Sequence, residues 1–181
     1  MGSTRPAVAA LLLLVSAGAG AYEPTGEVSL NAGGRGTGAS FDEERVVGPT
    51  VNLSLTEGGA WSGDFLGITV DLSVTPDRIT GSNVDLHVEV TKGETSVRGN
   101  LFGRRVHLET GRKGVQWRMG NCSLDLGRQK SGALQGGYGC VGGSSRIPTV
   151  TGAKMRLIGR AGAQDAPYPQ LVLALMAVLA G

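Results

Sequence analysis

Residues 63–73 read GDFLGITVDLS, and residues 99–109, 36 positions later, read GNLFGRRVHLE. Both segments contain a glycine, an Asp or Asn, two large apolar residues and a second glycine. Two variable residues follow, and then Val, a polar residue and Leu. A pattern that recurs in the same register indicates a repeated structural unit. This repeat is the strongest indication of fold in the chain.

Two looser copies of the pattern occur at residues 79–90 and 117–127. The segment VDLHVEV, residues 84–90, alternates strictly between apolar and ionisable residues, which predicts a strand with one buried face. Between the copies lie turn sequences rich in Pro, Gly and charge, at residues 75–78, 91–94, 110–114 and 127–132. Short strands separated by regularly spaced turns are typical of a β-meander.

We therefore predict an all-β fold, an antiparallel meander of repeated hairpins that is barrel-like or forms a β-solenoid. The repeated glycines are expected where hairpin turns or close strand approach require a residue without a side chain. Closure into a barrel is favoured because it removes exposed sheet edges. The tail QLVLALMAVLA, residues 170–180, has no alternation and predicts a short C-terminal apolar helix that packs on the β domain.

The order of segments predicts a secreted or periplasmic protein. Residues 1–21 have the positive start, apolar run and Ala-Gly-Ala exit of a signal peptide. Residues 22–50 are expected to form a Gly-rich N-terminal loop segment, residues 51–163 the repeated hairpin domain, and residues 164–181 the helix. After signal removal the chain is not expected to span a membrane. An alternative for the tail is a lipid-anchor processing signal, because small residues at 161–163 precede it.

The two cysteines, Cys122 and Cys140, are expected to form a disulfide, since an oxidising compartment favours a bridge over free thiols. Closing this 18-residue loop would contribute about 3 kcal/mol through the unfolded state. The alternative, Cys140 as a catalytic nucleophile, lacks a His nearby in the sequence.

Charge is divided along the chain. Residues 22–97 contain 12 acidic and 4 basic residues, whereas residues 98–181 contain 12 basic and 3 acidic residues. Exposed charges on neighbouring strands could simply pair across the sheet. Alternatively, basic turns at one end of the meander could form a collar that attracts an anionic partner. The candidate binding residues of this collar are Lys92, Arg112, Lys113, Arg128 and Lys130.

The polar face of the repeated strands offers a second candidate site. Asp85, His87 and His107 could approach one another on adjacent strands, as a general acid/base pair or a metal site would require. A solvated strand face gives the same alternation, and no hydrolase motif is present. The glycines at 33–38 lack the Lys-Ser/Thr of a phosphate loop. With a solvated face favoured over a divalent-ion site, no cofactor or metal is expected.

These observations favour a non-catalytic binding or structural module that contacts an anionic glycan, a lipid surface or an acidic protein. Nucleic acid is not expected as a partner, because readers of single strands interleave stacking aromatics with basic residues, whereas Trp61 and Trp117 occupy strand positions. Two alternatives remain open: a carrier of a small apolar ligand inside a barrel, and a hydrolase using the His87, His107 and Asp85 face.

Overall fold

The structure, a computed structural model, describes residues 24–91, 93–141, 149–159 and 169–181. The segment interpreted as a signal peptide lies outside these residues. The described part contains the strands β1 (Gly26–Ala32), β2 (Arg35–Phe41), β3 (Arg45–Gly48), β4 (Val51–Leu55), β5 (Trp61–Phe65), β6 (Ile68–Thr75), β7 (Arg78–Gly81), β8 (Val84–Thr91), β9 (Glu94–Leu101), β10 (Arg104–Thr110), β11 (Gly114–Met119), β12 (Cys122–Arg128), β13 (Leu134–Cys140) and β14 (Thr149–Gly159), and the helix α1 (Gln170–Ala180).

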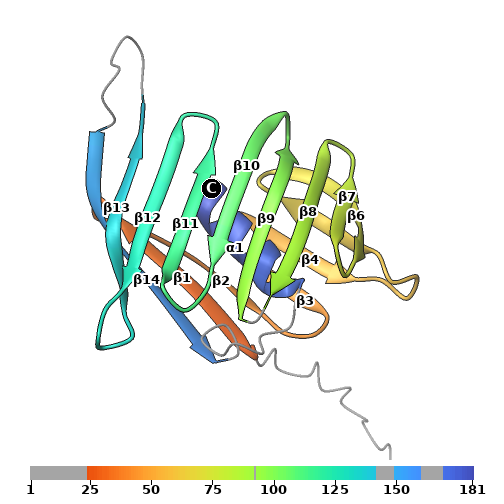
Figure 1. The fold of residues 1–181 in the computed structure, drawn as a ribbon. Coiled ribbons are helices and arrows are strands. Elements are labelled where there is room, and N and C mark those ends of the chain that lie inside the picture. Colours follow the sequence, from red (N-terminus) through yellow and green to blue (C-terminus); the bar gives the residue numbers. More distant parts are fainter. Residues whose placement is uncertain (1–23, 92, 142–148, 160–168) are drawn as a thin grey trace, which may run out of the picture.

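The strands form one closed antiparallel barrel (Figure 1). Each strand pairs with the next along the chain, and β1 pairs with β14 over the whole length of β1. The predicted all-β meander is confirmed, and it closes as a barrel. Every strand has a paired neighbour on both sides, and the shortest junction is that of β2 and β3, which pair through Ser40–Val47 and Phe41–Val46.

Connections alternate between the two ends of the barrel. We call the end with the turns after odd-numbered strands the odd rim and the other end the even rim; the odd rim is the upper end in Figure 1. Six odd-rim turns have only two residues, at 33–34, 49–50, 66–67, 82–83, 102–103 and 120–121. The even rim carries the turns at 42–44, 56–60, 76–77, 111–113 and 129–133 and the connection from β8 to β9.

The repeated sequence forms two equivalent hairpins, β5–β6 and β9–β10. Their turns, Leu66-Gly67 and Phe102-Gly103, both have positive φ at both residues, as two-residue type I′ turns require. A bulky residue at positive φ is unfavourable. Leu66 and Phe102 are partly buried against the core, so their packing at the odd rim offsets this cost.

The first glycine of each repeat is required by close backbone approach. A Cβ atom on Gly63 would collide with the carbonyl oxygen of Asn52 on β4, and one on Gly99 with that of Asp85 on β8. Both glycines also have positive φ, 141° and 157°. The repeat therefore encodes a backbone geometry at two places in the barrel.

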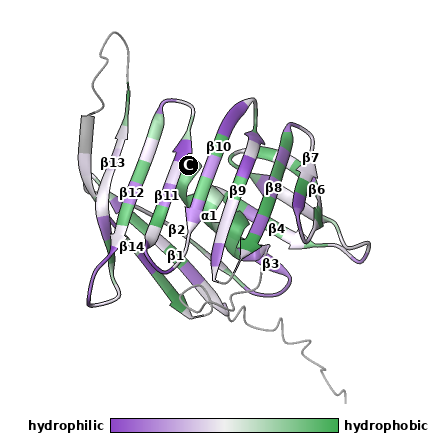
Figure 2. Cartoon of the chain, in the orientation of Figure 1, coloured by the Kyte–Doolittle hydropathy of each residue, from purple (hydrophilic) through white to green (hydrophobic). Residues whose placement is uncertain are grey.

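Hydrophobic and hydrophilic residues alternate along several strands (Figure 2), and the apolar residues fill the barrel interior. In β8, Val84, Leu86 and Val88 are buried, whereas Val90 on the same face is 56% exposed because it lies at the even rim. Trp61 and Trp117 are both buried in this core, as their strand positions predict.

The helix α1 lies inside the barrel, where it packs against β1, β2 and β3 (Figure 1). It runs from the even rim, where Gln170 donates to the carbonyl of Glu43 at 3.0 Å, to the odd rim, where Thr50 donates to the carbonyl of Ala177 at 3.0 Å. Residues 172–179 are all buried. The helix is apolar on all sides because β-structure surrounds it.

The expectation of a loop over residues 22–50 is wrong for the described residues, because this segment forms β1, β2 and β3. Glycines obscured the alternation: Gly33 and Gly34 make a two-residue turn with positive φ, and a Cβ on Gly48 would collide with the carbonyl of Gly38. Glycine is needed where the backbones of these strands approach each other closely, and a glycine-rich segment without apolar alternation resembles a loop in the sequence.

The predicted disulfide is present. Cys122 begins β12 and Cys140 ends β13, and the two residues lie directly opposite each other in the sheet. The bridge therefore ties these strands at the odd rim. Among the described residues, no helix has the length and apolar character needed to cross a membrane.

Candidate anion-binding surface

The predicted basic collar falls on one rim, as the alternating connections require. Arg112 and Lys113 lie in the turn after β10, and Arg128 and Lys130 lie at the turn after β12, both on the even rim. Lys92 lies outside the described residues. The Arg128 side chain donates to the carbonyl of Gly132 at 3.1 Å, so part of its hydrogen-bonding capacity serves its own turn.

The even rim is not basic throughout. The other half of this rim, formed by the turns after β2, β4 and β6, carries acidic residues: Asp42, Glu43, Glu44, Glu57 and Asp77. The division of charge along the sequence therefore becomes a division across the barrel, with an acidic side and a basic side. An anion could therefore be attracted only to the basic half of this rim, at the turns after β10 and β12.

The three residues considered for catalysis do not converge. His87 on β8 and His107 on β10 both lie directly opposite Arg98 on β9, which separates them. Two strand spacings put their backbones about 10 Å apart. Asp85 lies nearer the odd rim and is bound by Arg78 through two hydrogen bonds of 2.9 and 3.1 Å.

The outer face of β7–β11 instead carries a continuous basic row. Direct cross-strand pairing places its members side by side on consecutive strands. All five side chains lie on the outer face, because residues paired in this way share one face of the sheet. The row consists of Arg78, His87, Arg98, His107 and Arg118.

A hollow of about 480 Å³ opens beside this row on β9–β11; we call it the basic hollow. Its ionisable side chains are Arg98, Arg105, His107 and Arg118, and Asn100 adds an amide. Gly99 and Gly120 also line it, and the space around Gly120 is open, with no atom within 4 Å of an added Cβ. No carboxylate lines this hollow, so it is a concave surface of one charge sign.

Neighbouring carboxylates compensate only part of this charge. Glu109 accepts a hydrogen bond from His107 at 2.8 Å and lies 3.6 Å from Arg98. The hydrogen bond from His107 lowers the pKa of Glu109, and the charges of His107 and Arg98 lower it further, against an opposing effect of partial burial. Within the described residues, neither Arg105 nor Arg118 forms an ion pair.

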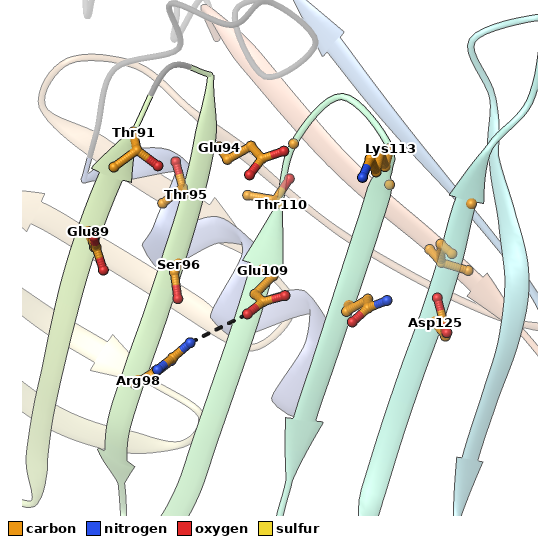
Figure 3. A pocket seen from close by; sticks show the side chains of 15 residues that line it. Glu89, Thr91, Glu94, Thr95, Ser96, Arg98, Glu109, Thr110, Lys113 and Asp125 are labelled. Carbon is orange, nitrogen blue, oxygen red and sulfur yellow. Dashed lines mark ion pairs between the residues drawn. The ribbon is translucent and has the colours of Figure 1, made fainter.

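A second hollow of about 400 Å³ lies on the even-rim side of the basic row; we call it the acid-lined hollow (Figure 3). Direct cross-strand pairs form its outer row on β8–β12, and Arg98 lines both hollows. Gly111, Gly114 and Gly127 line it beyond this row, and Gly127 has no atom within 4 Å of an added Cβ. The outer row consists of Glu89, Ser96, Glu109, Gln116 and Asp125.

Within the part of the chain that the structure describes, no group of three or more His, Cys, Asp or Glu side chains has the geometry of a metal site. The charged side chains of both hollows are also largely solvated. The side chain of Arg98 is 68% exposed and that of Glu109 is 47% exposed. Exposed charged groups of this kind are available for charge-assisted hydrogen bonds to a ligand.

Sequence reasoning missed Arg98, Arg105 and Arg118. One signal was available in the segment GNLFGRRVHLE: a two-residue turn at Phe102-Gly103 pairs Arg98 with His107 and Asn100 with Arg105. Arg118 joins them only through the register across the three-residue turn at 111–113. Local sequence pattern favours the basic turns because their cationic residues are contiguous in sequence, whereas the residues of the basic hollow come from three different strands.

In comparisons with known proteins, no family model, no curated protein and no solved structure matches the chain.

Proposed function

We propose that this protein is a non-catalytic binding module of the cell exterior that recognises an anionic partner through the basic hollow on β9–β11. The observation that carries the proposal is the pair Arg105 and Arg118, which lie in a concave surface lined by no carboxylate and form no ion pair in the described structure. Guanidinium groups recognise carboxylates, sulfates and phosphates by paired hydrogen bonds.

Three further features support a surface role. The helix α1 occupies the barrel interior, where a small apolar ligand would otherwise bind. The strand-face histidines are held apart by Arg98. The disulfide is compatible with an oxidising compartment, secreted or periplasmic. Together they favour binding on the outside of the barrel over a carrier or a hydrolase.

The test is isothermal titration calorimetry with dextran sulfate as the anionic probe, at low and at physiological ionic strength. Replacing Arg105 and Arg118 together by Gln should weaken binding about tenfold or more, which corresponds to about 1.4 kcal/mol. Binding of the unaltered protein should weaken as salt increases.

The matched control replaces Arg35 and Arg45, exposed residues of β2 and β3 on the other side of the barrel, by Gln. This variant has the same net charge as the R105Q/R118Q variant. Equal losses of affinity in the two variants would show a response to net charge alone and would refute a defined site.

A further inference from the structure

The two hollows form one continuous surface along the strand direction. Both lie on the outer face of the same strands, and Arg98 lines both of them. Along β10 and the turn after it, this surface extends from Arg105, near the odd rim, to Gly111 at the even rim. At ~3.3 Å per residue along β10, this span is roughly 20 Å. A ligand that fills it is longer than a single oxyanion.

The two halves of this surface require different chemistry from their ligand. The basic hollow offers guanidinium groups to an anionic group. The acid-lined hollow offers four carboxylates against two cations, Arg98 and Lys113, together with the hydroxyls of Thr91 and Ser96 and the amide of Gln116. Carboxylates accept hydrogen bonds strongly from hydroxyl donors and repel anions. The matching ligand has an anionic group next to a neutral unit rich in hydroxyls.

We propose that the two hollows are neighbouring subsites of one groove, and that the anionic partner is an acidic polysaccharide whose charged units alternate with neutral ones. The charged unit binds among Arg98, Arg105 and Arg118. The neutral unit binds in the acid-lined hollow, between Ser96 and Gln116. This inference rests on the proposed function and specifies the partner of the same site.

Other anionic partners fit this surface less well. A lipid surface or a uniformly charged polymer would bring negative charge against Glu89, Glu109 and Asp125 as well as against the arginines. An acidic protein would need a contact area of about 1,000 Å² or more, whereas these hollows have the volumes of small-ligand sites.

The structure offers a way to block the second subsite alone. Gly127 lies in β12, lines the acid-lined hollow, and has no atom within 4 Å of an added Cβ. A threonine there extends into the hollow without a clash at its Cβ, and its β-branched side chain suits a strand. Gly152 in β14 has equally open space and lies outside both hollows. Gly152→Thr is therefore the matched control.

The experiment measures affinity by calorimetry for two hexasaccharides: one of hyaluronan, in which carboxylated and neutral units alternate, and one of polygalacturonate, in which every unit is carboxylated. We expect the unaltered protein to prefer the alternating probe about fivefold or more. G127T should abolish that preference, whereas G152T should keep it. Thermal unfolding of both variants confirms that the barrel is intact.

The outcomes separate this inference from the proposed function. If R105Q/R118Q loses binding to both probes but G127T changes neither affinity, the anion site stands and the glycan groove is refuted. A preference for polygalacturonate, or tighter binding to phosphatidylserine vesicles than to either glycan, also refutes the groove. If R105Q/R118Q binds both probes as well as the unaltered protein does, the proposed function itself fails.

Discussion

The hairpins β5–β6 and β9–β10 have the same backbone and different outer faces. Their interior positions match: Val70 corresponds to Val106 and Leu72 to Leu108, and all four are buried. Their outer positions differ: in place of Ser62, Thr69 and Asp71, the second hairpin has Arg98, Arg105 and His107. The comparison separates the residues that make the fold from those that give one side of the barrel its charge.

The largest effect should come from the shared backbone. Gly63→Ala and Gly99→Ala should each lower the free energy of unfolding by about 2–3 kcal/mol, because a Cβ would collide with a carbonyl oxygen of the neighbouring strand at a positive φ. Urea unfolding measures this loss. Gly36→Ala, with open space around its Cβ, is the control and should change stability by less than about 0.5 kcal/mol. Unequal losses at 63 and 99 would show that the hairpins are not structurally equivalent.

The next effect concerns binding and should leave folding almost unchanged. The triple variant R98S/R105T/H107D gives the second hairpin the outer residues of the first. We expect about tenfold or greater loss of affinity for dextran sulfate, with unfolding free energy within about 1 kcal/mol of the unaltered protein. A loss of stability as large as that of Gly99→Ala would mean that these outer side chains support the fold.

Two carboxylates on the charged side of the barrel should titrate below their ordinary range. Hydrogen bonding to Arg78 lowers the pKa of Asp85 from its ordinary value of 3.8, and hydrogen bonding to His107 lowers the pKa of Glu109 from 4.5. A pKa lowered by folding contributes stability above these ordinary values, and this contribution is lost as pH falls through the folded-state pKa. NMR titration of the side-chain carboxyl carbons measures both groups.

In the same titration, Arg78→Gln should raise the pKa of Asp85, and His107→Gln should raise that of Glu109. Each substitution should leave the other carboxyl group unchanged, since the two pairs do not share a residue. If Asp85 titrates at the same pH with and without Arg78, the two hydrogen bonds do not persist in solution.

The smallest effect is expected from the rim. Arg128→Gln together with Lys130→Gln removes two charges from the predicted collar, but we expect less than a twofold change in affinity for dextran sulfate. Neither residue lines the hollows, and both lie on a rim whose other half is acidic, so the attraction they exert is partly cancelled. A loss comparable to that of R105Q/R118Q would move the site from the hollow to the collar.

The sequence predicts interior positions better than outer ones. The Val-polar-Leu strands, the apolar helix at 170–180 and the Cys122–Cys140 bridge each follow from local pattern or composition, and the structure contains all three. The strands β2 and β3 were missed because Gly36, Gly38 and Gly48 interrupt their alternation. Gly38 and Gly48 stand where the backbone of a neighbouring strand comes close, since a Cβ there would lie 3.2 Å from the carbonyl oxygen of Val28 and 2.5 Å from that of Gly38.

The candidate site depends on information that no local pattern contains. Arg118 lies beside His107 because β10 and β11 pair with a particular register, and a shift of one residue would turn it toward the interior. The charge imbalance between the two halves of the chain was visible, but its position on the barrel was not. The contiguous basic turns were therefore favoured over the residues that meet across strands.

The central claim is that the outer face of the second hairpin, and not that of the first, binds an anionic partner. It is tested most directly by an amide NMR titration of the protein with hyaluronan hexasaccharide. The account predicts that the largest saturable shifts lie at Arg98, Asn100, Arg105, His107 and Arg118, with β5–β6 unchanged. Shifts concentrated in the turn at 129–133, or distributed equally over both hairpins, would contradict it.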